Sequence, residues 1–216
     1  MHAAECGYLE VLQWAREHGC EWDWMTCACA ARGGHLEVLQ WAREHHCPWD
    51  EWTCKHAAEY GHLEVLVWAR EHGCEWDWMT CERAAAGGHL AVLQWAREHD
   101  FPWSEITGTD PLGRFVGMSN ICARAAEGGH LEVLKFAREN GCEWDYETCS
   151  GAAEGGHLAV LQWAWEHGCP WEEDACDAAA QFGHLATLQW LRAHDCPWHT
   201  ATCMYAADSG HLEAGA

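Results

Sequence analysis

The chain has 216 residues, which is enough for one or two ordinary domains. It carries 34 acidic residues against 12 lysines and arginines, a formal net charge of −22. A surface this acidic repels phosphate backbones and anionic lipids, so we expect binding to neither nucleic acid nor membranes. No apolar stretch is long enough to cross a bilayer. The hydrophobic content of 49% excludes a disordered tail.

The first residues, Met1–Cys6, lack a basic region followed by an apolar core, so we expect no secretory signal. The odd number of cysteines, 15, then favours reduced thiols. We therefore expect a cytoplasmic protein, with the nucleus as the alternative.

Internal repetition dominates the sequence. The string Gly-His-Leu recurs in steps of 27 residues, with one step of 41, and its histidines are His35, His62, His89, His130, His157, His184 and His211. Columns of cysteine and tryptophan follow the same spacing, beginning with Cys27 and Trp22. The longer step places 14 extra residues at 108–121. The pattern predicts a single array over 1–216 of about seven to eight units, with a loop insertion at 108–121.

Each unit is predicted to contain two short helices, helix A and helix B. Helix A begins after a good N-cap residue, namely Asp23, Asp50, Asp77, Ser104 or Asp145, and ends at the glycines before the Gly-His histidine. Helix B begins near that histidine and runs for about ten residues. It stops at residue types that tolerate a left-handed backbone: Gly19, His46, Gly73, Asp100, Gly141, Gly168 and Asp195. No run alternates as a strand does, so no sheet is expected.

Neither helix can bury its apolar face alone. Leu36, Val38, Leu39, Trp41 and Ala42 spread over most of one helix B, which suits a helix covered on two sides. Stacking of successive pairs then buries a continuous core. We therefore predict an all-α fold, an α-solenoid of helix-turn-helix repeats.

The stretch Ala57-Ala58-Glu59-Tyr60-Gly61-His62-Leu63-Glu64-Val65-Leu66, continuing to Gly73-Cys74, resembles the ankyrin repeat. The unit is shorter than the usual ankyrin unit, and the missing residues fall where the β-hairpin finger would be. The resemblance implies ankyrin-like repeats that lack fingers and serve as a non-enzymatic scaffold for protein–protein interaction. Both chain ends fall inside repeats, so we expect either a fragment of a longer array or frayed ends. Related arrays carry a further domain, such as an F-box, elsewhere in the chain.

The cysteine and histidine columns raise the alternative of a metal site. Three substitutions within these columns argue against it, because Phe101, Asn140 and Tyr8 stand where other repeats carry cysteine or histidine. We expect buried small side chains, no metal and no cofactor. Disulfides between neighbouring repeats exceed the reach of a bridge, whereas a bridge between Cys47 and Cys54 is left open by geometry.

Catalysis has little support in the sequence. There is no nucleophile elbow, no phosphate-binding glycine loop and no His-Glu-x-x-His motif. We therefore expect no catalytic residues and no enzymatic activity.

Comparison of the repeats with one another locates a candidate binding surface. The two positions after the helix A cysteine vary most, and we interpret this row as the concave face of the stack. The expected partner-binding residues are His56, Arg83, Arg124, Tyr205, Trp24, Trp52 and Trp78, joined by Arg114 and Phe115 of the insertion. The competing interpretation of this row is an exposed face whose sequence varies without a function. The competing interpretations of the insertion are a tolerated insertion and an unspliced in-frame segment of the gene.

The acidic surface suits a protein partner with basic patches, bound by a monomer. Two other hypotheses stay open. One is a metal- or redox-responsive module that uses the cysteine and histidine columns, and the other is a structural spacer in a longer chain.

Overall fold

The computed structural model describes residues 2–99, 108–109, 115–116 and 120–209. It divides into two compact units, Met1–Ser119 and Asn120–Ala216. The boundary falls within the insertion at 108–121, and the continuity of one array across it stays a prediction. No helix of the described residues is both long and apolar enough to span a bilayer.

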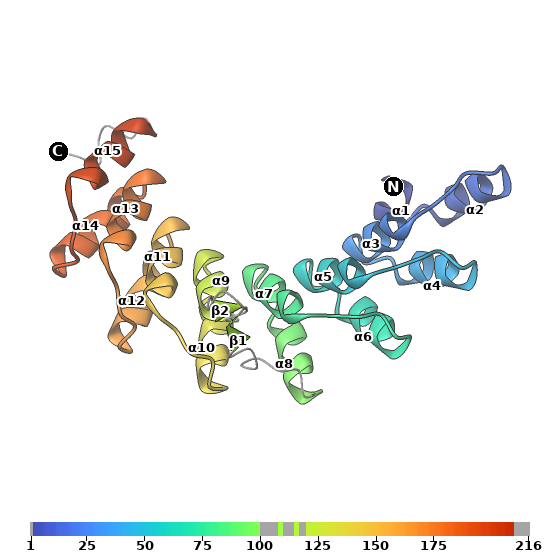
Figure 1. Cartoon of the computed structure of the whole chain (residues 1–216), viewed down its shortest axis with the longest axis horizontal. Helices are drawn as coiled ribbons and strands as arrows, with labels where there is room; N and C mark the ends of the chain where they lie inside the picture. The colour runs from blue at the N-terminus through green and yellow to red at the C-terminus, as the bar shows by residue number, and fades with distance from the viewer. Residues whose placement is uncertain (1, 100–107, 110–114, 117–119, 210–216) are drawn as a thin grey trace. The chain divides into compact units, whose positions relative to one another are not determined.

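The predicted alternation of two short helices is confirmed in both units (Figure 1). Odd-numbered helices correspond to helix A and even-numbered helices to helix B. The first unit contains α1 (His2–Glu5), α2 (Leu9–Glu17), α3 (Trp24–Arg32), α4 (Leu36–Glu44), α5 (Glu51–Glu59), α6 (Leu63–Glu71), α7 (Trp78–Ala86) and α8 (Leu90–Glu98). The second contains α9 (Ile121–Glu127), α10 (Leu131–Glu139), α11 (Tyr146–Glu154), α12 (Leu158–Glu166), α13 (Glu173–Gln181), α14 (Leu185–Ala193) and α15 (Thr200–Asp208).

Aspartate side chains begin the A helices as expected. Asp23, Asp50, Asp77 and Asp145 are N-cap residues, and each carboxylate accepts a hydrogen bond from the backbone N–H two residues later, at 3.0–3.1 Å. Ser104, the fifth expected cap, lies outside the described residues.

The predicted left-handed stop after helix B is also confirmed. His46 and Asp195 adopt positive φ angles of 62° and 61°. The glycines of this column, which follow α2, α6, α10 and α12, also have positive φ angles: Gly19, Gly73, Gly141 and Gly168. Asp100 lies outside the described residues. The reversal lets the chain turn back to begin the next helix A.

Successive A helices pack against one another, and each packs on its own helix B. The order is α1, α3, α5 and α7 in the first unit, and α9, α11, α13 and α15 in the second. The core takes paired alanines from helix A and a Val-x-x-x-Ala face from helix B, for example Ala57, Ala58, Val65, Leu66 and Ala69, each at most 2% exposed. Each repeat therefore completes its core with residues of its neighbours, as the solenoid prediction requires.

The Gly-His histidines connect one repeat to the next. The Nε2 atom of His89 donates to the backbone oxygen of Glu59, 30 residues earlier, at 2.9 Å. His35, His62 and His184 make the equivalent bond over the same separation at 2.8–3.0 Å. These histidines therefore satisfy carbonyl groups at the end of the preceding helix A.

The insertion differs from the expectation that no strand forms. Gly108–Thr109 (β1) and Phe115–Val116 (β2) pair in antiparallel register, with Thr109 opposite Phe115. Two residues per strand are too few for alternation to show in the sequence. After the insertion, Asn120 occupies the N-cap position of α9, but its side chain donates to Glu147 rather than to its own helix.

Candidate functional site

A cluster on α5 and α7 gathers three of the residues expected to bind a partner. Glu59 Oε2 accepts a hydrogen bond from Arg83 Nη1 at 2.9 Å and lies 3.3 Å from His56 Nδ1. The Arg83 guanidinium also lies over the Trp52 ring, 5.2 Å from its centroid. Because Glu59 and Arg83 come from successive A helices, the stacking of repeats creates this cluster. We call Trp52, His56, Glu59 and Arg83 the α5/α7 cluster.

The cluster is half-exposed and electrically balanced. The side chains of His56, Glu59 and Arg83 are 24%, 30% and 30% exposed. The carboxylate fixes the guanidinium in one orientation, and the indole supports its flat face. Such a pre-ordered aromatic and arginine surface is typical of the residues that dominate protein interfaces.

Lys55 is a functional candidate that was not expected from the sequence. Its ammonium lies 3.0 Å from Asp77 Oδ2, 3.6 Å from Glu51 Oε1 and 4.9 Å from the Trp52 centroid, with only 5% of the side chain exposed. The signal was a lysine at a position where no other repeat carries one, in a chain that has only two lysines. Lys55 supports Trp52 from below the surface and joins α5 to the cap of α7.

The same position corrects part of the expected surface. The first residue after the helix A cysteine was expected to face solvent, but Ala28, Lys55 and Ala123 are only 3–6% exposed. In these three repeats the second residue of the pair is the accessible one, because helical spacing turns it one position further around the helix. In the other repeats the first residue is not buried, and Met204 is 51% exposed, so the expectation is wrong for these three repeats only.

The other expected residues do not join the α5/α7 cluster. Trp24 begins α3 and is 38% exposed, and Trp78 begins α7 and is half-buried. Arg124 on α9 is exposed and forms an ion pair with Glu127, whereas Tyr205 lies half-buried on α15. These last two belong to the second unit, where α11 and α13 separate them.

The two expected residues of the insertion cannot be placed as a contact surface. Arg114 lies outside the described residues. Phe115 is described only through its backbone, which pairs with Thr109.

A second surface feature runs along the B helices, where the tryptophans are half-buried rather than wholly core. In five repeats an arginine near the end of helix B lies over a tryptophan six residues later, at 4.2–4.5 Å: Arg16 over Trp22, Arg43 over Trp49, Arg70 over Trp76, Arg138 over Trp144 and Arg192 over Trp198. That tryptophan meets the helix B tryptophan of the following repeat edge-on, for example Trp144 and Trp163 at 5.8 Å. The six-residue spacing was the signal in the sequence.

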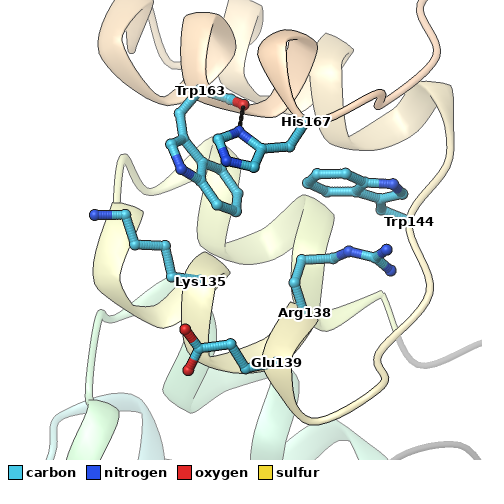
Figure 2. A pocket seen from close by; sticks show the side chains of 6 residues that line it. All are labelled: Lys135, Arg138, Glu139, Trp144, Trp163 and His167. Carbon is cyan, nitrogen blue, oxygen red and sulfur yellow. Dashed lines mark hydrogen bonds between the residues drawn. The ribbon is translucent and has the colours of Figure 1, made fainter.

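Figure 2 shows this arrangement around an open cavity of about 470 Å³ in the second unit. Trp163 and His167 of the α12 repeat face Lys135 and Arg138 of α10 across it. The charged groups are already bonded, since Lys135 pairs with Glu132 at 2.7 Å and Arg138 donates to the carbonyl of Cys142. The cavity therefore offers indole and imidazole surface, and Glu139, which is exposed, adds a carboxylate to its lining.

One repeat departs from this pattern. Trp165 stands where the others carry arginine, and its ring stacks on Trp171 at 5.5 Å and 16°. Trp190 meets both rings edge-on at 5.7 Å. Trp165 is 39% exposed, which makes this the most apolar part of the helix B surface in the described second unit.

The column cysteines were expected to be small core side chains, and burial is confirmed for all of them except Cys20 and Cys203, which are exposed. The bridge between Cys47 and Cys54, which geometry had left open, does not form: both cysteines are free, and the Cys47 thiol is hydrogen-bonded to Cys27 and the Cys54 thiol to Cys74. The winding of each repeat brings the end of helix B back to its own helix A. Within the described residues, no three or more His, Cys, Asp or Glu side chains form a group that could hold a metal ion.

No protein-family model matches the chain, and no curated protein sequence matches it. Solved structures do match, among them the crystal structure of the human ASB11 ankyrin repeat domain. That structure is similar with a TM-score of 0.60 and 15% sequence identity, over 87% of this chain and 95% of that one. With the repeated helical pairs described above, this similarity shows that the chain has the ankyrin-repeat fold, built from units of 27 residues.

Proposed function

We propose that the chain is a scaffold that binds a protein partner through the helix A face, with the α5/α7 cluster as its centre. Ankyrin repeats generally serve protein–protein interaction rather than catalysis. The observation that carries the proposal is the half-exposed set of Trp52, His56 and Arg83, held in one arrangement by Glu59.

The partner we expect presents basic patches around a central contact. The net charge of −22 speeds encounter with such a protein, while the cluster supplies the short-range contacts. In the second unit, Arg124 on α9 and Tyr205 on α15 are separate candidate contacts, each on its own helix A. The Trp24 and Trp78 side chains, at the beginnings of α3 and α7, would form its edge.

The test is quantitative capture of partners from a lysate by the immobilised chain. The double variant His56→Ala/Arg83→Ala is compared with wild type and with Gln94→Ala/Glu98→Ala, a control pair on the exposed side of α8. We expect a specific partner that the control variant retains and the cluster variant loses by at least about tenfold, as expected for residues at the centre of an interface.

Equal capture by both variants would refute the assignment of the cluster. Binding that does not weaken with added salt would remove the electrostatic part of the proposal. Circular dichroism on each variant confirms that the helices are intact before capture is compared.

A further inference from the structure

Ten of the fifteen cysteines form five pairs, each within one repeat. The pairs are Cys27–Cys47, Cys54–Cys74, Cys122–Cys142, Cys149–Cys169 and Cys176–Cys196, always 20 residues apart. The first member lies on helix A, the second follows helix B, and their thiols are hydrogen-bonded to one another. All ten are at most 4% exposed.

In four of the five pairs, a hydrogen bond to the backbone holds the second thiol in place. Cys47 donates its S–H to the carbonyl of Asp23 at 3.3 Å, and Cys74 donates to that of Asp50 at 3.2 Å. Cys169 and Cys196 make the equivalent bond at 3.3 and 3.4 Å. The acceptor is in each case the N-cap residue of the same repeat's helix A. The carbonyl therefore fixes the second sulfur beside the first.

We propose that these five pairs are dithiol sites at which a hydroperoxide forms one disulfide within each repeat. One thiolate of a pair attacks the peroxide oxygen, the O–O bond breaks, and hydroxide leaves as a sulfenic acid forms. The second thiol attacks that sulfur, the S–S bond forms, and the oxygen leaves as water. Two thiols and one hydrogen peroxide thus yield one disulfide and two waters. The fold places the two cysteines of a pair side by side, as the approach of Cys122 Sγ to within 3.9 Å of the Cys142 carbonyl shows, and the sulfurs must then close to a bond of about 2.05 Å.

In three of the pairs, the hydrogen bond between the thiols lowers the pKa of one of them, Cys47, Cys74 or Cys176. The hydrogen bond from Cys27 lowers the pKa of Cys47, and the bond from Cys54 lowers that of Cys74. Burial opposes ionisation at both, so the pairs react slowly and only during local opening of a repeat.

A guanidinium stands beside four of the pairs and is absent from the fifth. Arg43, Arg70, Arg138 and Arg192 act on the pairs of their own repeats and favour the thiolate. At the Cys149–Cys169 pair the equivalent position is Trp165, which carries no charge. This pair should therefore be the last to oxidise.

The test treats the reduced, folded full chain with hydrogen peroxide, quenches it with a thiol alkylating reagent and maps unreduced peptides by mass spectrometry. We expect five intramolecular links of 20-residue spacing, a loss of about 2 Da for each, and reversal by dithiothreitol. Cys81 is the internal control, because the residue 20 positions later is Phe101 and no such link can form. The same treatment in concentrated urea should abolish the spacing preference.

Two results would overturn the proposal. One is that all five pairs stay reduced at peroxide concentrations that oxidise the exposed Cys20 and Cys203. The other is links of a different spacing in the folded chain.

A separate variant tests whether the guanidinium promotes oxidation of the neighbouring pair. Trp165→Arg gives the fifth pair the charge that the other four have, and its oxidation should accelerate on the order of tenfold, the effect of one pKa unit on the thiolate fraction. An unchanged rate at Cys149–Cys169 in this variant, with its helices intact, would refute the contribution of the charge.

Discussion

Replacing Gly61 by alanine should destabilise the contact between two repeats. Gly61 has a φ of 74°, and a Cβ atom there would lie 2.4 Å from Nδ1 of His89 in the next repeat. The left-handed backbone alone costs an alanine about 1–2 kcal/mol. The imidazole must also move by about 1 Å to reach ordinary contact distance, which breaks its 2.9 Å bond to the Glu59 carbonyl. Losing that bond and leaving the carbonyl without it adds about 1–3 kcal/mol.

Gly73 provides a matched control. Its φ is 81°, and a Cβ atom there meets nothing within 4 Å. Gly73→Ala should therefore cost only the backbone part, about 1–2 kcal/mol, and the difference between the two variants isolates the histidine contact.

Urea denaturation followed by far-UV circular dichroism measures the comparison, with the midpoints used directly because repeat arrays depart from two-state unfolding. We expect a clearly lower midpoint for Gly61→Ala than for Gly73→Ala. Equal midpoints would show that the Gly-His histidines do not hold the repeats together, and the stabilising role assigned to the His89–Glu59 bond would be wrong.

Three further predictions concern single side chains. Asp77→Ala removes both a helix cap and the partner of the buried Lys55 ammonium, so it should lower the free energy of unfolding by about 3 kcal/mol. Asp50→Ala removes a cap alone and should cost about 1 kcal/mol. Similar losses in the two variants would contradict the role of the ion pair. Burial raises the pKa of Asp50, so ionisation of this carboxyl lowers the stability of the folded chain as pH rises through that pKa. Asp50→Asn should therefore be more stable than wild type at neutral pH and lose this advantage in acid, as measured by urea denaturation at a series of pH values. An advantage that grew in acid would contradict the raised pKa. Trp165→Arg restores the arginine that covers the equivalent tryptophan elsewhere, so thermal unfolding should show stability within about 1 kcal/mol of wild type, and a large loss would mean that stacking on Trp171 is essential.

The regular spacing of the sequence was sufficient for the fold because its signals are local. These signals are the N-cap aspartates, the left-handed backbone at the end of helix B, as at His46, and the Gly-His column. Each acts within a few residues of the chain, and the pattern recurs from repeat to repeat. The two-residue strands of the insertion could not be predicted, because their pairing depends on a chain reversal that leaves no periodic pattern.

The candidate site could be predicted only in part. Variation between repeats pointed to His56 and Arg83, since these positions are free of the core. It could not show that Glu59, which lies one helical turn from His56, would also reach Arg83, because that second contact joins side chains of two repeats.

What the sequence by itself determined is the identity and order of the helical pairs, since helix boundaries follow from local caps and from which faces are apolar. The tertiary structure alone decided which groups meet across the turns: Cys27 with Cys47 rather than Cys47 with Cys54, the buried ammonium of Lys55 with Asp77, and the imidazole of His89 with the carbonyl of Glu59. The physical reason is that these groups lie 20 to 30 residues apart in the chain, so their meeting depends on how the two helices of one pair fold together and on how that pair stacks on the next. Both are set by the packing of the whole core rather than by any short segment.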